Sequence, residues 1–175
     1  VVAALTGGGY VVAWRSEGQD GSSAGVYAQR FANDGTLLGS EFLVNSATDN
    51  GQFQPNIAAT ADGGFVVAWG TDYYNSSFTE YRDIYFQRYN AAGVAQGGET
   101  QANPGGESTV TQSQPNIVGL SGGGFVTVWT DDSKDGSSQG IYGQRFNADG
   151  TVNGASFLVN TYTTSAQSEP DMAAL

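Results

Sequence analysis

A threefold internal repeat constrains the fold of this chain more than any other feature of its sequence. Residues 14–31 and 129–146 carry almost the same text: a tryptophan, a polar loop with Asp-Gly-Ser-Ser, and a Tyr-x-Gln-Arg-aromatic segment. A looser version occupies residues 69–89 and is three residues longer in its middle. A pattern that recurs at this spacing predicts a repeat protein, in which each unit packs against its neighbours.

Prolines set the period of the repeat. Pro55, Pro115 and Pro170 each close a Gln-x-(Gln/Glu)-Pro motif, and a short apolar segment follows each of them. The opening residues, Val-Val-Ala-Ala-Leu, match that apolar segment, so we expect the chain to be part of a longer series of repeats. The predicted units are repeat 1 at 1–55, repeat 2 at 56–115, repeat 3 at 116–170, and the start of a fourth repeat at 171–175.

Each repeat is predicted to contain four short strands. The first is the segment after the proline, for example 57–60, and the second is an apolar run that ends in tryptophan. The third is the Tyr-x-Gln-Arg segment, and the fourth lies at 41–45 and 156–160 but is reduced to about 99–102 in repeat 2. Glycine-rich turns separate the strands, because glycine readily adopts the positive φ of tight hairpins. No long window shows a helical period.

Four antiparallel strands in a unit of this length are typical of a β-propeller blade. Propellers usually have four to eight blades, so three repeats predict a partial propeller. Further repeats of the chain or a second molecule would then complete the ring. The alternative is a linear stack of β repeats. In either architecture the protein is all-β.

Composition excludes several function classes. The net charge of −11 argues against nucleic acid and against anionic membrane surfaces, which both require a basic face. The chain contains no cysteine and no histidine, so thiol chemistry, a Ser-His-Asp triad and the usual zinc sites are excluded. No apolar run is long enough to span a membrane. The sequence therefore predicts no membrane insertion and no enzymatic activity.

The combined motifs resemble a known kind of repeat. The series Gln-x-x-Pro, Gly-Gly-Gly-Phe-Val-x-x-Trp, Asp-Gly-Ser-Ser-x-Gly and Asn-Ala-Asp-Gly is similar to tandem repeats of large secreted bacterial proteins that are labelled calcium-binding or RTX-like. The resemblance covers the whole chain and implies an extracellular or cell-surface bacterial protein with many repeats. Tandem RTX nonapeptides do not occur here, so the calcium roll of that family is not implied.

The polar loop of repeat 3 is the candidate metal site. Asp131, Ser133 and Asp135 stand at alternate positions before Gly136, and oxygen ligands at this spacing can converge on calcium. The closing glutamate of a full calcium loop is missing. The competing interpretation is that these aspartates form Asx turns that shape a hairpin loop.

An insertion at 72–82 breaks the pattern of repeat 2 and supplies the candidate ligand site. We expect this loop to expose aromatic side chains for contact with a glycan or a protein. Its candidate binding residues are Tyr73, Tyr74, Asn75 and Phe78. Six residues that recur at fixed positions are instead predicted to pack within or between the repeats: Trp14, Trp69, Trp129, Arg30, Arg88 and Arg145.

These observations predict a non-enzymatic structural or adhesive segment of a larger bacterial surface or filament protein. Its expected partners are further repeats of the same chain or other copies of itself. The alternative is a lectin-like propeller that binds glycans with the help of calcium.

Overall fold

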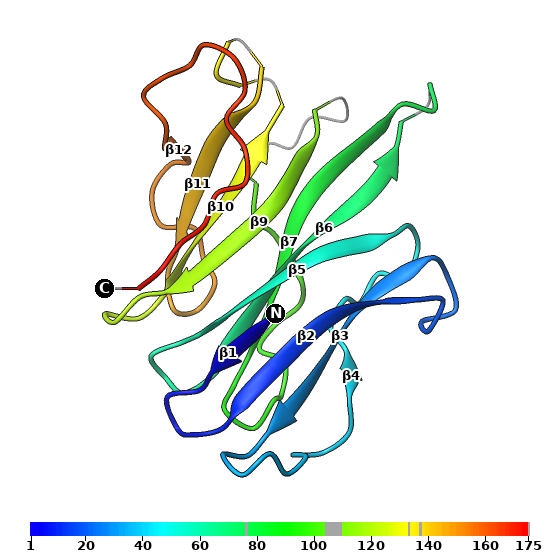
Figure 1. The fold of residues 1–175 in the computed structure, drawn as a ribbon, viewed down its shortest axis with the longest axis vertical. Coiled ribbons are helices and arrows are strands. Elements are labelled where there is room, and N and C mark those ends of the chain that lie inside the picture. The colour runs from blue at the N-terminus through cyan, green and yellow to red at the C-terminus, as the bar shows by residue number, and fades with distance from the viewer. Residues whose placement is uncertain (76, 104–109, 133, 137, 175) are drawn as a thin grey trace.

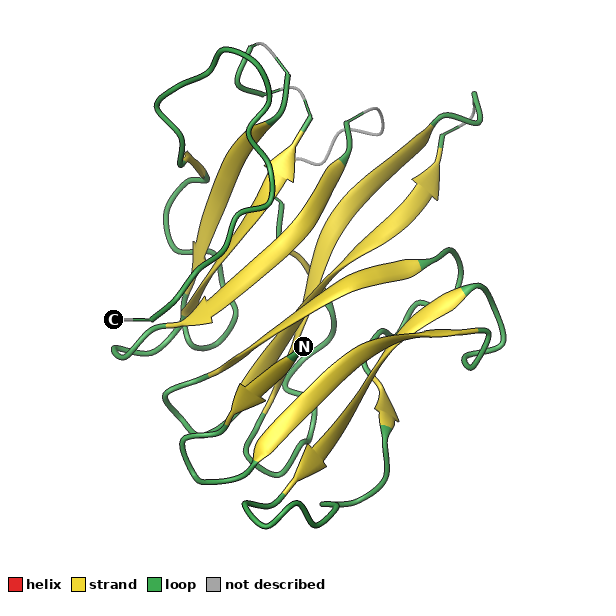
Figure 2. Cartoon of the chain, in the orientation of Figure 1, coloured by secondary structure: helices red, strands yellow, loops and turns green. Residues whose placement is uncertain are grey.

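A computed structural model describes residues 1–175 except 76, 104–109, 133, 137 and 175. The described residues form twelve strands and no helix (Figures 1 and 2). The strands make three four-stranded antiparallel sheets, each with its strands in chain order, which confirms the predicted all-β, blade-like units. We call the three sheets blades 1, 2 and 3; in Figure 1 blade 2 lies between the other two.

The bounds of the strands follow the repeat. Blade 1 contains β1 (Val2–Ala4), β2 (Tyr10–Glu17), β3 (Ala24–Phe31) and β4 (Phe42–Leu43). Blade 2 contains β5 (Gln52–Ala59), β6 (Phe65–Tyr74), β7 (Glu80–Tyr89) and β8 (Thr100–Gln101). Blade 3 contains β9 (Gln112–Gly119), β10 (Phe125–Asp131), β11 (Gly140–Phe146) and β12 (Phe157–Leu158).

Each blade has one face rich in aromatic residues and one face of smaller apolar residues. The aliphatic face of blade 1, with Val11 and Val26, packs against the aromatic face of blade 2, with Phe65, Trp69 and Tyr89. The second boundary repeats this arrangement, because the aliphatic face of blade 2 packs on Phe125, Trp129 and Phe146 of blade 3. The side chains of alternate strand residues point to opposite faces, so the apolar central strands bury both faces of a middle blade.

The inner strands begin earlier than the sequence predicts. We expected the first strand of repeat 2 at 57–60, but β5 begins at Gln52 and crosses Pro55. A β-bulge makes this possible: the pairing of β5 with β6 shifts between Phe53 and Asn56, and Gln54 adopts a φ of 51°. β9 has the same bulge at Gln114. The predicted boundaries at 55/56 and 115/116 therefore fall inside strands.

The bulges also join successive repeats. The N–H of Gln114 donates to the side-chain oxygen of Gln54 (3.0 Å), and the N–H of Glu169 donates to that of Gln114 (3.0 Å). Asn116 further donates to the Asp171 carboxylate (2.7 Å). Residues that follow Glu169 therefore run beside β9 (Figure 1), in the place of the inner strand of a next blade.

The insertion of repeat 2 is mostly strand rather than loop. β6 and β7 extend through it, with Asp72 opposite Arg82 and Tyr74 opposite Glu80. The pairing ends at Tyr74 and Glu80, and hydrogen bonds of Asn75 with Phe78 and Thr79 close the turn. The prediction of a loop over the whole of 72–82 is thus wrong, because 72–74 and 80–82 continue the pairing of the two central strands. They lengthen this hairpin, which projects at the upper right of Figure 1.

Candidate functional sites

The extended β6–β7 hairpin holds the four predicted ligand-binding residues in two different environments. Tyr73 is half-buried: it stacks on Tyr81 with ring centroids 5.4 Å apart and its hydroxyl donates to that of Tyr85 (3.0 Å). Burial is the main cause that raises the pKa of Tyr73, so this phenol remains protonated. Tyr73 therefore stabilises the hairpin through its contacts with Tyr81 and Tyr85.

The tip of this hairpin presents the other residues. Tyr74 and Phe78 are 60% and 89% exposed, so both rings are available to a partner. The Asn75 side-chain oxygen accepts hydrogen bonds from the N–H groups of Ser77 and Thr79, and thus shapes the turn. At the base of the hairpin, Arg82 bonds Asp72 (2.7 Å) and lies over the ring of Phe53, 4.7 Å from its centroid.

The predicted calcium ligands Asp131 and Asp135 bond to different protein groups. Asp131 ends β10 and is fully buried; its carboxylate accepts hydrogen bonds from the Gln112 side chain (3.1 Å) and the Lys134 N–H (3.2 Å). Asp135 accepts from the N–H of Ser138 (3.3 Å), and Ser133 lies outside the described residues. Within the described part of the chain, no group of three or more acidic residues is placed to hold a metal ion. Calcium binding stays a prediction.

The recurring Asp-Gly-Ser-Ser-x-Gly motif has a steric basis. In blade 1 the carboxylate of Asp20 folds back over Gly25, where a Cβ would lie 2.9 Å from its oxygen. In blade 3 Asp135 lies over Gly140 in the same way, with a Cβ position 2.9 Å from its own Cβ. The motif therefore needs glycine at the start of the third strand, whether or not the aspartate binds an ion.

A buried polar cluster between blades 2 and 3 was not predicted. The Asn103 side chain donates to Asp83 (2.7 Å) and to Gln112 (3.0 Å), and Gln112 donates on to Asp131. Lys134, the single lysine of the chain, places its ammonium 3.7 Å from the Asp131 carboxylate. Burial is the largest cause that raises the pKa of Asp83.

The sequence carried a signal for this cluster. Asp83 stands where the other two repeats have Gly25 and Gly140, and Asp131 stands where they have Ser16 and Thr71. Both acidic residues therefore depart from the repeat pattern, and both lie at the boundary between blades 2 and 3.

The recurrent arginines hold the turn of the next blade. Arg30 of blade 1 donates to the carbonyl oxygens of Ala91 (2.7 Å) and Ala92 (2.5 Å) in blade 2. Arg88 of blade 2 donates to the carbonyl oxygen of Asp149 in blade 3 (2.5 Å), one repeat further on. Arg145, at the same position in blade 3, is exposed. Of the three tryptophans, Trp69 and Trp129 are buried and Trp14 is half-buried.

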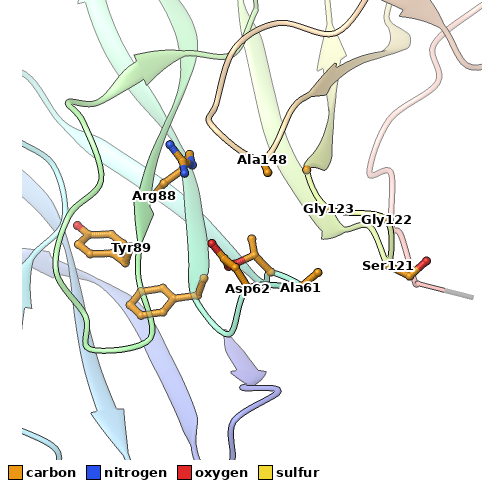
Figure 3. A pocket seen from close by; sticks show the side chains of 11 residues that line it. Ala61, Asp62, Arg88, Tyr89, Ser121, Gly122, Gly123 and Ala148 are labelled. Carbon is orange, nitrogen blue, oxygen red and sulfur yellow. The ribbon is translucent and has the colours of Figure 1, made fainter.

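A pocket of about 360 Å³ lies beside hairpin turns of blades 2 and 3 (Figure 3). Arg88, Asp62 and Ala148 reach it from three different segments. Asp62 accepts hydrogen bonds from the Thr60 hydroxyl (2.6 Å) and the Gly64 N–H (3.1 Å), and mainly the Thr60 bond lowers the pKa of Asp62. Both charged residues of the pocket therefore help to position the turns around it.

A scan against protein-family models and a search of curated proteins find no match to this sequence. No helix in the described residues is long and apolar enough to cross a membrane. The fold and the side-chain contacts therefore carry the functional argument.

Proposed function

We propose that this chain is a non-enzymatic structural or adhesive segment of an extracellular bacterial surface or filament protein, built from stacked β-blades. The observation that carries the proposal is the contact of an arginine with the turn of the following blade, which occurs at the same repeat position at both boundaries. A guanidinium that donates to the backbone of the neighbouring blade contributes to the packing of the blades.

The other recurrent groups support the same function. The glutamines of the bulges join one repeat to the next, and the aromatic face of each following blade receives the aliphatic face before it. Arg30, Arg88 and the bulge glutamines are thus occupied by contacts between blades. The location outside the cell rests on the resemblance to secreted repeat proteins, and the net charge of −11 suits an exposed, soluble surface.

A covalent tandem of two copies tests this function. Residue 170 of the first copy is joined directly to residue 1 of the second, which continues the period of the repeat. In a stacked array stability rises with the number of neighbour contacts, so the tandem should unfold in urea at a higher midpoint than the single chain. A matched tandem with Val159→Asp in its first copy should lose that gain. Two independent domains with the midpoint of the single chain would refute the proposal.

The exposed tip of the β6–β7 hairpin favours a second candidate function, glycan binding. Tyr74 and Phe78 offer rings on which sugars can stack, and the hairpin projects beyond its neighbours. A glycan array with and without calcium tests this candidate. Binding that is lost in Tyr74→Ala but kept in Tyr162→Ala, an equally exposed tyrosine of blade 3, would support it, and an empty array would contradict it.

A further inference from the structure

The two outer blades present complementary faces. Tyr10, Trp14 and Phe31 of blade 1 occupy the repeat positions of Phe65, Trp69 and Tyr89 of blade 2. In blade 2 these three side chains are covered by blade 1. All three are half-buried in the chain, whereas their counterparts in blades 2 and 3 are buried. Blade 1 thus offers an aromatic face of the kind that receives the aliphatic face of a preceding blade.

Blade 3 offers the matching aliphatic face. Val159 is 49% exposed, whereas its counterparts Val44 and Ala102 are 4% and 0% exposed because the next blade covers them. The exposed Arg145 occupies the position from which Arg30 and Arg88 reach the turn of the next blade. These two outer faces would meet as the two internal boundaries already do.

The edge strand β1 of blade 1 is also shorter than its counterpart β5 in blade 2. On this edge β1 pairs with β2 from Tyr10 to Val12, and Val1 continues the pairing to Ala13. β2 itself extends to Glu17, and in blade 2 the equivalent stretch pairs with Gln52 and Phe53, which precede the bulge. Among the described residues, none pairs with this side of β2 beyond Ala13.

Residues 167–174 have the sequence pattern of β5, the longer strand that forms this edge in blade 2. Gln-Ser-Glu-Pro-Asp-Met-Ala-Ala aligns with Gln-Phe-Gln-Pro-Asn-Ile-Ala-Ala of β5, and its last two residues repeat Ala3 and Ala4 of β1. Glu169 has the positive φ of the other two bulges (58°), and its N–H is held by Gln114. The segment is therefore positioned as an inner strand but is not paired in a sheet of its own.

We propose that this segment completes blade 1 of a second copy of the chain. In that complex residues 167–174 pair with β2 of the second copy and take the place of its β1, while the aliphatic face of blade 3 covers Tyr10, Trp14 and Phe31. The register follows from β5 and β6, and sets Ser168 opposite Arg15 and Met172 opposite Val12. Strand exchange between identical chains and strand addition at an open edge are established routes to association.

The proposal rests on the proposed function, since both use contacts between successive blades. It adds that separate molecules make these contacts head to tail, through an exchanged strand. Two copies give six blades, a number at which propellers close; continued addition would instead give a filament. A following repeat in a longer chain would use the same face.

Engineered cysteines test the register, because the chain has none of its own. Arg15→Cys and Ser168→Cys, both at exposed positions, are prepared as separate proteins, mixed and oxidised. Opposite residues of paired strands have Cα separations that a disulfide tolerates. A mixed disulfide dimer should form, and Ser168→Cys mixed with Val94→Cys, an exposed control on blade 2, should give none above the single variants.

Sedimentation provides the second readout. The wild-type chain should self-associate with rising concentration, and Val159→Asp should weaken the association at least about tenfold, because it buries a carboxylate against apolar rings. Val94→Asp should leave it unchanged. A monomer at all concentrations, or association without the mixed disulfide, would overturn the strand exchange. The covalent tandem could still stack in that case, so the two proposals fail separately.

Discussion

At each boundary between blades, a phenylalanine of one blade packs on the last aromatic residue of the third strand of the next blade. The phenylalanine comes from a different strand at each boundary. Phe42 of β4 packs on Tyr89 of blade 2 with ring centroids 5.2 Å apart, and Phe86 of β7 packs on Phe146, the equivalent residue of blade 3, at 4.8 Å. The cross-strand partner of Phe42 is Ala28, and that of Phe86 is Thr100. Blade 3 follows blade 1, with Gly143 opposite Phe157. Each pair thus contains one phenylalanine and one smaller residue.

Because the phenylalanine stands on either strand of the pair, we predict that a second substitution in blade 2 can restore stability lost by the first. Phe86 is fully buried, so Phe86→Ala should lower the free energy of unfolding by about 3–5 kcal/mol. Adding Thr100→Phe to that variant moves the ring to the strand that carries it in blades 1 and 3. Restored ring burial and one aromatic pair, worth about 0.5–1.5 kcal/mol beyond burial, should return at least about 1 kcal/mol. Thr100→Phe alone should bring no gain, because Phe86 already fills the site.

Urea unfolding of the wild type, both single variants and the double variant gives the coupling energy directly. For a chain of this size each kcal/mol corresponds to roughly 2–4 °C in Tm, so thermal scans give an independent check. A double variant that is no more stable than Phe86→Ala would show that the two strand positions do not share one site. The compensation across the three blades would then be a coincidence of composition.

Three further predictions test individual contacts by urea unfolding. Arg88→Ala should cost about 1–2 kcal/mol by removing the bond to the turn of blade 3, whereas Arg145→Ala should leave the stability of the monomer unchanged. Gly124→Ala should cost more than about 1 kcal/mol, since its φ is +79° and a Cβ would lie 2.3 Å from a carbonyl oxygen; Gly122→Ala, with open space, should be close to neutral. Burial raises the pKa of Asp83, so its contribution to stability is present below the ordinary carboxyl pKa of about 3.9 and is lost as pH rises through the raised value. Asp83→Asn should therefore be more stable than wild type near neutral pH, and the difference should shrink below about pH 4.

The fold could be predicted because its determinants are local and occur three times. Turn glycines and apolar central strands recur in phase, so four-stranded units followed from the sequence. The start of β5 was missed because proline usually ends a strand, and the bulge at Gln54 that admits Pro55 depends on pairing with β6. The hairpin extension was missed for a similar reason: polar residues such as Asp72 and Arg82 suit a loop until they lie opposite one another.

The candidate sites were less predictable because they depend on burial. Asp131 has the spacing of a calcium ligand, but its position at the end of β10 buries it beside Gln112. Sequence spacing does not show whether a carboxylate points to solvent or to a neighbouring blade. The link from Asp83 to Asp131 joins residues 48 positions apart, through Asn103 and Gln112, and so could be found only once both blades were placed.

Comparison of the blades separates the contacts that build the array from those that distinguish this segment. A group that recurs meets the same neighbour at each internal boundary, as Arg30 and Arg88 do, and therefore cannot provide specificity for one partner. Specific recognition must come from positions that break the repeat. Among the described residues, Asp83 and Asp131 break it where they are buried, so they affect the stability of one boundary and its pH dependence. Tyr74 and Phe78 break it where they are exposed, so a partner that binds this segment and not its neighbours is expected at the tip of the β6–β7 hairpin.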